Sequence, residues 1–191
     1  MKKEILLVGG GGHCRSVIDV IEQEGRYTIA GIIDKPELVG QDILGYKIIG
    51  SDNDLKQLFK IYKYALVTVG QIKSSAIRVK LFNLLESIGY TLPIIISPLA
   101  YLSKRSTIDR GTVIMHHALI NAGATVGANC IVNSKSLIEH DATIENHCHI
   151  STATVINGGV VVKSNSFIGS NSTSKEYIEI DGFKKAGSLI K

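Results

Sequence analysis

The strongest constraint on this chain is a large aliphatic residue that recurs every six positions from residue 96 to residue 168. A series of small residues follows it four positions later, and the residue directly after each aliphatic one is mostly polar or glycine. The aliphatic series is interrupted at Ser174 and resumes at Ile180. Its members are Ile96, Leu102, Ile108, Ile114, Ile120, Val126, Val132, Ile138, Ile144, Ile150, Ile156, Val162 and Ile168. The small series is Ala100, Ser106, Thr112, Ala118, Ala124, Cys130, Ser136, Ala142, Cys148 and Thr154.

A period of six fits neither of the usual regular elements. Six residues turn an α-helix by about 240° net, so the aliphatic side chains would point in three directions and form no buried stripe. In a strand all of them would face one side, but strands usually run for only about 3–10 residues. The pattern therefore predicts short strands separated by corners and coiled into a prism, with the aliphatic residues inside and the small residues where the walls converge.

The overall charge and hydropathy exclude several classes of protein. The 191 residues provide for one large or two small domains, and the formal net charge is only +4. This mild charge suits small substrates that carry phosphate, and no basic stripe demands a nucleic acid. No apolar stretch is long enough to span a membrane, and the N-terminal apolar run is too short for a signal sequence. We therefore expect a cytoplasmic protein without nucleic-acid or membrane partners.

Two of the three cysteines belong to the repeat. Cys130 and Cys148 are 18 residues apart, and both occupy the small inward position. We expect them to stack inside the coil as reduced thiols that act as small hydrophobic residues. Neither has a second cysteine or histidine at ligand spacing, so we expect no metal site.

Residues 1–92 have a different pattern, in which strands and helices alternate. This order predicts a small parallel sheet in a Rossmann-like α/β domain, followed by the coiled repeats of residues 93–191. The expected strands cover residues 4–8, 27–33, 47–49, 65–69 and 91–95. The expected helices cover residues 14–23, 53–62 and 74–87.

A run of four glycines, residues 9–12, follows the first expected strand and precedes His13. The dinucleotide fingerprint needs a third glycine that is here Cys14 or Arg15, depending on the frame, so NAD is disfavoured. The loop still offers close backbone approach and a helix N-terminus to a diphosphate, and Asp34 lies near the distance at which an acid binds a ribose hydroxyl. The alternative is a tight turn without a ligand, and we favour binding.

The glycine loop with its histidine, the small sheet and the hexads together resemble the hexapeptide-repeat, left-handed β-helix acyltransferases over nearly the whole chain. The nearest likeness is to bacterial sugar acetyltransferases of the bacillosamine-pathway N-acetyltransferase and sialic-acid O-acetyltransferase type. The resemblance implies a left-handed parallel β-helix with three hexads per coil, acetyl-CoA as co-substrate, and a homotrimer with its active site between neighbouring β-helices. It also implies that the N-terminal domain binds the nucleotide of a nucleotide-sugar through Gly12, His13, Asp34, Lys35 and Gly70. Arg78 is either a further contact or a solvated helix residue.

His140 and Asp141 lie on an outward segment of one hexad. Acetyl transfer from a thioester to an amine or hydroxyl needs a base that titrates near neutral pH, and histidine is the natural one. An adjacent carboxylate can orient the ring and stabilise its protonated form. The pair matches the catalytic His-Glu of the sugar acetyltransferases, with Asp in place of Glu. We therefore favour a catalytic His140 over an inert surface histidine.

The resemblance also assigns roles beyond this pair. It implies a substrate contact for Asn133, and contacts with acetyl-CoA for His149, Gly158 and Gly169. Gly158 lies 18 residues after His140, and its N–H would bind the thioester oxygen as a single-donor oxyanion site. The alternative for His149 is a solvated corner histidine. The Gly-Val-Pro-Ala-Lys segment that family members place near coenzyme A is absent.

With this resemblance, the sequence predicts an acetyl-CoA-dependent transferase that acetylates the amino group of a UDP- or dTDP-linked 4-amino-4,6-dideoxy sugar for bacterial surface glycan or glycoprotein synthesis. His140 would be the general base, oriented by Asp141. One alternative is O-acetylation of a sialic-acid-type sugar by the same residues. Another is a non-catalytic β-helix that only binds a nucleotide-sugar. The intact His-Asp pair argues against this scaffold, and the shortened C-terminus argues for it.

Overall fold

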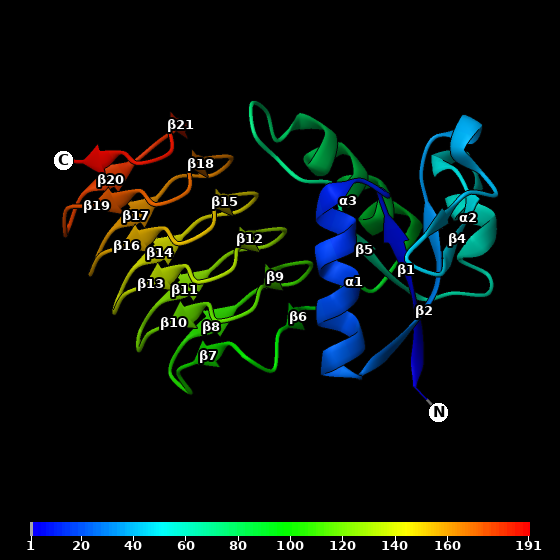
Figure 1. The fold of residues 1–191 in the computed structure, drawn as a ribbon, viewed down its shortest axis with the longest axis horizontal. Helices are drawn as coiled ribbons and strands as arrows, with labels where there is room; N and C mark the ends of the chain where they lie inside the picture. The colour runs from blue at the N-terminus through cyan, green and yellow to red at the C-terminus, as the bar shows by residue number, and fades with distance from the viewer. Residues whose placement is uncertain (1) are drawn as a thin grey trace. The chain divides into compact units, whose positions relative to one another are not determined.

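Residues 2–191, which the computed structural model describes, divide into two units by their contacts (Figure 1). The first unit ends at Gly70 and resumes over Ala76–Pro93. The second unit contains Gln71–Ser75 and Ile94–Lys191. The short segment Gln71–Ser75 therefore packs with the hexads, although it lies between two stretches of the first unit in the sequence.

The first unit is built on a five-stranded sheet with the order β3-β4-β2-β1-β5. Neighbouring strands are parallel except β3 and β4, so the sheet is mixed. Its core includes the fully buried Ile5, Leu6 and Leu7 of β1. The strands are β1 (Lys3–Val8), β2 (Tyr27–Ile33), β3 (Asp42–Ile43), β4 (Tyr46–Gly50) and β5 (Tyr64–Val67). The helices are α1 (Gly12–Glu24), α2 (Leu55–Leu58) and α3 (Ala76–Ile88), with 3₁₀ turns at Pro36–Leu38 and Asp52–Asp54.

Three details of this unit differ from the sequence prediction. The antiparallel strand β3 was not expected, and it forms because Leu44 and Gly45 adopt positive φ angles of 52° and 89°, which suit a tight two-residue hairpin turn. The strand expected at residues 91–95 is wrong: Thr91 makes only a single bridge to Tyr64, and Ile95 begins β6 of the second unit. The helix expected at residues 53–62 is reduced to a 3₁₀ turn and the four residues of α2.

The second unit consists of two-residue strands stacked in three parallel sheets, which Figure 1 shows as successive coils from green to red. Each strand pairs with the strand three further along, in a register of 18 residues such as Ile131 with His149. This is the predicted coil, consistent with a left-handed β-helix. The strands are β6 (Ile95–Ile96), β7 (Tyr101–Leu102), β8 (Thr107–Ile108), β9 (Val113–Ile114), β10 (Leu119–Ile120), β11 (Thr125–Val126), β12 (Ile131–Val132), β13 (Leu137–Ile138), β14 (Thr143–Ile144), β15 (His149–Ile150), β16 (Val155–Ile156), β17 (Val161–Val162), β18 (Phe167–Ile168), β19 (Thr173–Ser174), β20 (Glu179–Ile180), β21 (Phe183–Lys184) and β22 (Leu189–Ile190).

The interior of the coil is filled by the two series that the sequence predicts. The aliphatic residues from Ile114 to Ile168 are buried, and each contributes about 1.5–3 kcal/mol of transfer free energy before chain entropy is subtracted. Cys130 and Cys148 are fully buried free thiols, as expected. The residue between each aliphatic and the next small position often has a positive φ, which makes the corner. Asp141 is one of these corner residues, with a φ of 58°.

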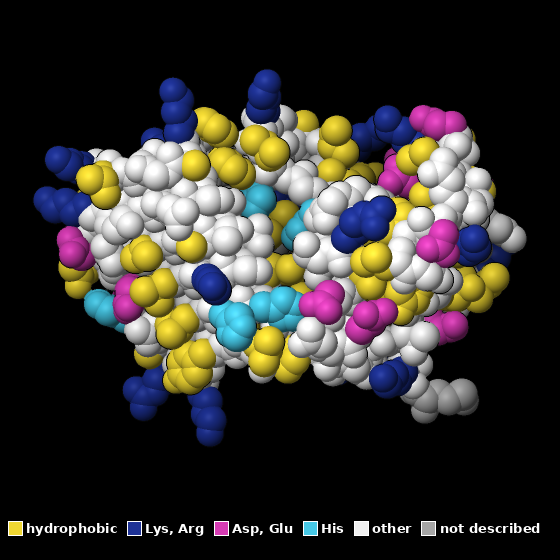
Figure 2. All heavy atoms as spheres, in the orientation of Figure 1, with side chains coloured by type: hydrophobic (Ala, Val, Ile, Leu, Met, Phe, Trp, Pro, Cys, Tyr) yellow, Lys and Arg dark blue, Asp and Glu magenta, His cyan; other side chains and the backbone are white. Residues whose placement is uncertain are grey.

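Surface charge and helix length add two simple facts. On the face that Figure 2 shows, Lys and Arg side chains are scattered singly among acidic ones and form no continuous basic patch. Within residues 2–191, no helix combines the length and apolar character needed to cross a membrane.

Candidate active site

His140 and Asp141 lie at the corner that follows β13. The Nδ1 atom of His140 is 2.9 Å from Oδ2 of Asp141, and the two side chains are 52% and 70% exposed. Because a carboxylate can only accept this hydrogen bond, Nδ1 carries the proton and Nε2 keeps a lone pair. The shorter aspartate therefore reaches the ring, and it orients an accessible base whose free atom is Nε2.

Glycines stand one coil before and one coil after this pair, and both are required by close approach. A Cβ on Gly158 would lie 2.6 Å from Nε2 of His140, and one on Gly123 would lie 2.3 Å from Oδ1 of Asp141. The N–H of Gly159 donates to the carbonyl oxygen of His140 at 3.0 Å. The turn that contains Gly158 thus rests directly against the imidazole.

The N–H of Gly158 is available to a ligand. Gly158 is buried, yet within residues 2–191 no acceptor lies in hydrogen-bonding geometry to its N–H. Its carbonyl oxygen accepts from the N–H of Tyr177 at 3.0 Å, which fixes the orientation of the turn. A buried backbone donor without an acceptor costs free energy, so it suggests a site where a ligand oxygen binds.

His149 lies on a different face of the β-helix, in β15. It is 8% exposed, so the alternative of a solvated corner histidine is wrong. Its Nδ1 atom is 2.7 Å from the carbonyl oxygen of Gln71, and its ring meets Phe167 edge to face. Asn133 does not join His140: its Nδ2 atom is 3.5 Å from Nε2 of His149.

Gly169 has a packing role in the structure. A Cβ at this position would lie 2.4 Å from the backbone nitrogen of Ala186 in the next coil. The N–H of Gly169 donates to the carbonyl oxygen of Lys184 at 2.9 Å. Close approach of two backbones therefore accounts for this glycine without a bound molecule.

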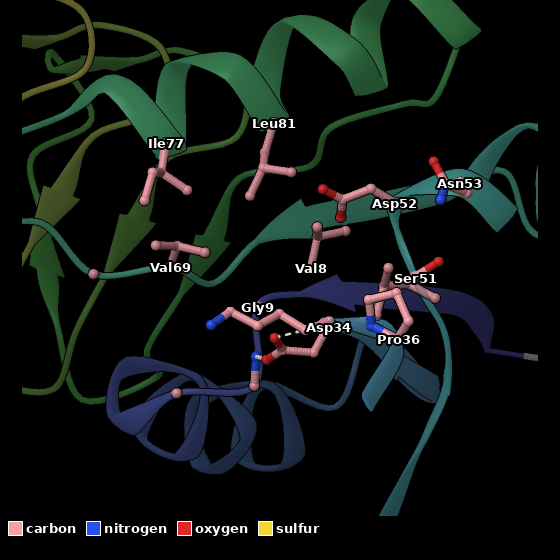
Figure 3. Close-up of a pocket in the computed structure, with 15 residues that line it drawn as sticks. Val8, Gly9, Asp34, Pro36, Ser51, Asp52, Asn53, Val69, Ile77 and Leu81 are labelled. Carbon is pink, nitrogen blue, oxygen red and sulfur yellow. Dashed lines mark hydrogen bonds between the residues drawn. The ribbon is translucent and has the colours of Figure 1, made fainter. Parts of the chain in front are cut away.

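The first unit holds a cavity of about 510 Å³ at the glycine loop. Figure 3 shows Ile77 and Leu81 projecting from α3 on one side, and Gly9 and Asp34 on the other. Oδ2 of Asp34 accepts the N–H of Gly10 at 2.5 Å, and Oδ1 accepts the N–H of Lys35 at 2.7 Å. Asp34 thus holds the glycine loop in place at the rim of the cavity.

The expected nucleotide contacts are only partly at this cavity. Asp34, Lys35 and Gly70 line it together with Gly9, Gly10 and Gly11. Gly12 and His13 are not among its lining residues: Gly12 begins α1, and the Cβ of His13 packs 3.5 Å from the Cβ position of Gly70. Arg78 is 2% exposed, so it is not a solvated helix residue.

Sequence reasoning missed one wall of the cavity, formed by Pro36, Ser51, Asp52 and Asn53. The signal was present, because polar residues directly follow β4, and ligands of parallel sheets bind beyond the carboxyl ends of the strands. The side chain of Asp54 accepts hydrogen bonds from the backbone and hydroxyl of Ser51, which fixes this loop. Asp52 directs its carboxylate toward the cavity in Figure 3.

Comparison with known proteins places this geometry in a known group. Perosamine N-acetyltransferase from Caulobacter crescentus, solved with CoA and GDP-perosamine, matches with 26% identity and a TM-score of 0.91. The match covers 98% of this chain and 88% of that chain. Residues 4–85 match the family model of the PglD N-terminal domain. The chain resembles the hexapeptide-repeat sugar acetyltransferases.

Further hexapeptide-repeat proteins share the fold at lower identity. The acetyltransferase domain of PglB from Neisseria gonorrhoeae, solved with acetyl coenzyme A, is 24% identical, with a TM-score of 0.90 over 100% of this chain and 92% of that chain. WeeI from Acinetobacter baumannii is 19% identical, with a TM-score of 0.59 over 98% and 96%. No curated protein sequence matches significantly. The predicted fold class and the predicted resemblance to this group are confirmed.

Proposed function

We propose that this protein transfers an acetyl group from acetyl-CoA to the amino group of a nucleotide-linked amino sugar. The observation that supports this proposal most strongly is the corner at His140. Its Nδ1 atom is bound to Asp141, and its Nε2 atom lies beside Gly158, whose N–H has no acceptor within residues 2–191. A base and an oxyanion donor in contact are the two groups that acyl transfer to an amine requires.

The reaction follows from these positions. The neutral amine of the sugar attacks the thioester carbonyl carbon and forms the new C–N bond, while Nε2 of His140 accepts a proton from the nitrogen. Asp141 stabilises the resulting imidazolium through Nδ1–H. The carbonyl oxygen gains negative charge, which the N–H of Gly158 binds. The C–S bond then breaks, and the leaving thiolate of coenzyme A takes up a proton, so the products are the N-acetylated sugar and coenzyme A.

The nucleotide would bind at the cavity of the first unit. Gly9, Gly10 and Gly11 present backbone to the cavity and precede the N-terminus of α1, which favours a diphosphate. Lys35 adds a cation at the rim. A nucleotide-sugar of the UDP, dTDP or GDP type fits this description, and the similar enzyme from Caulobacter crescentus was solved with GDP-perosamine.

The active form would be a homotrimer. One wall of the β-helix, made of β7, β10, β13, β16, β19 and β22, begins its strands with apolar residues that face outward, including Tyr101 at 60% and Leu189 at 78% exposure. This wall leads into the corner that carries His140, and His149 lies on another wall. A threefold assembly brings different walls of neighbouring chains together, so His140 of one chain would share a site with His149 of the next. We place the reaction in the cytoplasm, in the synthesis of surface glycans.

A direct test is the release of the coenzyme A thiol from acetyl-CoA, measured over a panel of acceptors. The panel contains UDP-, dTDP- and GDP-linked amino sugars, the matching sugars with a hydroxyl in place of the amine, and sialic acids. Turnover with an amino sugar, and a product whose mass increases by one acetyl group on nitrogen, is the expected result. Turnover with the hydroxyl sugars or sialic acids alone would favour O-acetylation, and no turnover with any acceptor would favour the scaffold.

A further inference from the structure

The corner that carries His140 repeats in each coil, and in two coils its second residue is capped by the side chain before it. Oδ1 of Asn121 accepts the N–H of Ala122 at 2.8 Å, and Oε2 of Glu139 accepts the N–H of His140 at 3.2 Å. These side-chain caps satisfy a backbone donor that has no partner in the ladder of the coil. The equivalent pair in the next coil is Asn157 and Gly158.

Asn157 does not cap Gly158. Its side-chain Nδ2 donates to the carbonyl oxygen of Ser174 at 2.6 Å, and its backbone N–H donates to Oγ of Ser174 at 2.9 Å. In the preceding coils the corresponding N–H groups of Asn121 and Glu139 donate to the carbonyl oxygens of Ile138 and Ile156. The hydroxyl of Ser174 has therefore taken over one hydrogen bond of the ladder and left its carbonyl oxygen for the amide of Asn157.

Ser174 is also the residue that interrupts the aliphatic series of the core. It is 3% exposed, at a position where the preceding coils place Ile138 and Ile156. A polar side chain at an interior position forfeits hydrophobic stabilisation, so its retention calls for a compensating role. The hydrogen bonds to Asn157 are the contacts that this hydroxyl gives in exchange.

From these contacts we infer that Ser174 and Asn157 are positioning residues that keep the N–H of Gly158 uncapped. Ser174 holds the amide of Asn157 away from Gly158, while Tyr177 and His140 fix the two sides of the next peptide unit through Gly158 O and Gly159 N–H. The donor is then pre-oriented and needs no rearrangement when charge develops on a ligand oxygen. This inference rests on the proposed role of Gly158 as the oxyanion donor.

A matched pair of variants separates this role from packing. Ser174→Thr keeps a hydroxyl acceptor, and Ser174→Val has nearly the same shape without it. We expect Ser174→Thr to retain turnover and Ser174→Val to lower kcat by about tenfold, because Asn157 becomes free to cap Gly158. KM for acetyl-CoA should change little, and the thermal midpoint of Ser174→Val should be no lower than that of Ser174→Thr. Equal kcat values for the two variants would overturn the inference.

Asn157 provides a second pair in which the usual order of severity is reversed. Asn157→Asp preserves the size of the side chain, but a carboxylate accepts the N–H of Gly158 as Glu139 accepts that of His140. Asn157→Ala removes any cap. We expect the isosteric Asp variant to lose more kcat than the Ala variant. The reverse order would indicate a purely structural asparagine.

A crystal structure of Ser174→Val tests the geometry without reference to activity. The inference expects an oxygen of Asn157 within about 3.2 Å of the nitrogen of Gly158. An Asn157 side chain that remains bound at residue 174 would contradict it. If the wild-type protein transferred no acetyl group at all, the proposed function would fail, while this structural result would still decide whether Ser174 controls the cap.

Discussion

The imidazole of His140 and the carboxylate of Asp141 meet at 2.9 Å although the two residues are adjacent in the chain. Neighbouring side chains usually diverge, and here the left-handed φ of 58° at Asp141 turns them toward each other. Aspartate and asparagine tolerate this conformation better than most residues. The corner of the β-helix therefore supplies the geometry that sets which nitrogen of His140 acts as the base.

The first prediction concerns the charge of Asp141. Asp141→Asn keeps the size and the tolerance of a left-handed φ, but it removes the charge that stabilises the imidazolium. We expect kcat to fall by at least about tenfold, within the 10²–10⁴-fold that a general base contributes. Asp141→Glu restores the charge and should recover part of the loss in the same steady-state assay. Equal kcat values for wild type and Asp141→Asn would exclude this role.

The second prediction concerns the core of the coil. Ile144 is 1% exposed and pairs with Val126 and Val162 in the neighbouring coils. Ile144→Asp buries an unpaired carboxylate, which costs several kcal/mol, so the protein should fail to fold or assemble. Thr125→Asp is the control, since Thr125 is exposed on the outer face of β11. Circular dichroism that gave both variants the wild-type thermal midpoint would refute the assigned interior.

The third prediction concerns the ligand of the glycine loop. Titration calorimetry should detect binding of UDP, dTDP or GDP and no tight binding of NAD, because the loop lacks the third glycine of the dinucleotide fingerprint. Gly10→Ala should weaken nucleotide binding at least about tenfold, since its Cβ would lie 2.5 Å from Cδ1 of Ile43 and 2.9 Å from Oδ2 of Asp34. Tight NAD binding with no binding of the three nucleotides would reverse the assignment.

The fourth prediction concerns the assembly. His140→Ala and His149→Ala proteins should each be nearly inactive, and refolding them together in equal amounts should restore activity well above either parent. With random assortment in a cyclic trimer, about a quarter of the neighbour pairs join two intact walls. Sites that took both histidines from one chain would all carry a lesion and stay inactive. A monomer by light scattering would also end this proposal.

Much of the fold was predictable because the hexads encode the interior directly. Ile138, Ile144 and Ile150 recur at one spacing, and that spacing is the register of the coil. The first unit was less predictable: the hairpin of β3 depends on the left-handed conformations of Leu44 and Gly45, which no pattern in the sequence announces.

The candidate site was predictable in its residues and less so in its contacts. His140, Asp141 and Gly158 follow from the motif and the 18-residue step. The burial of His149 depends on Gln71, which is 78 residues away in the sequence, so no local pattern indicates it. The cap of Gly158 was equally hidden, because it depends on which of two acceptors the side chain of Asn157 meets in the folded coil.

The most direct test of acetyl transfer with His140 as the base is the steady-state kinetics of His140→Asn and His140→Ala. Both variants would be measured at saturating acetyl-CoA with the amino sugar that the wild-type protein accepts. We predict that kcat falls by about 10²–10⁴-fold while KM for acetyl-CoA changes little, because the base acts in the chemical step. Turnover of either variant close to that of the wild type would contradict the assignment of His140.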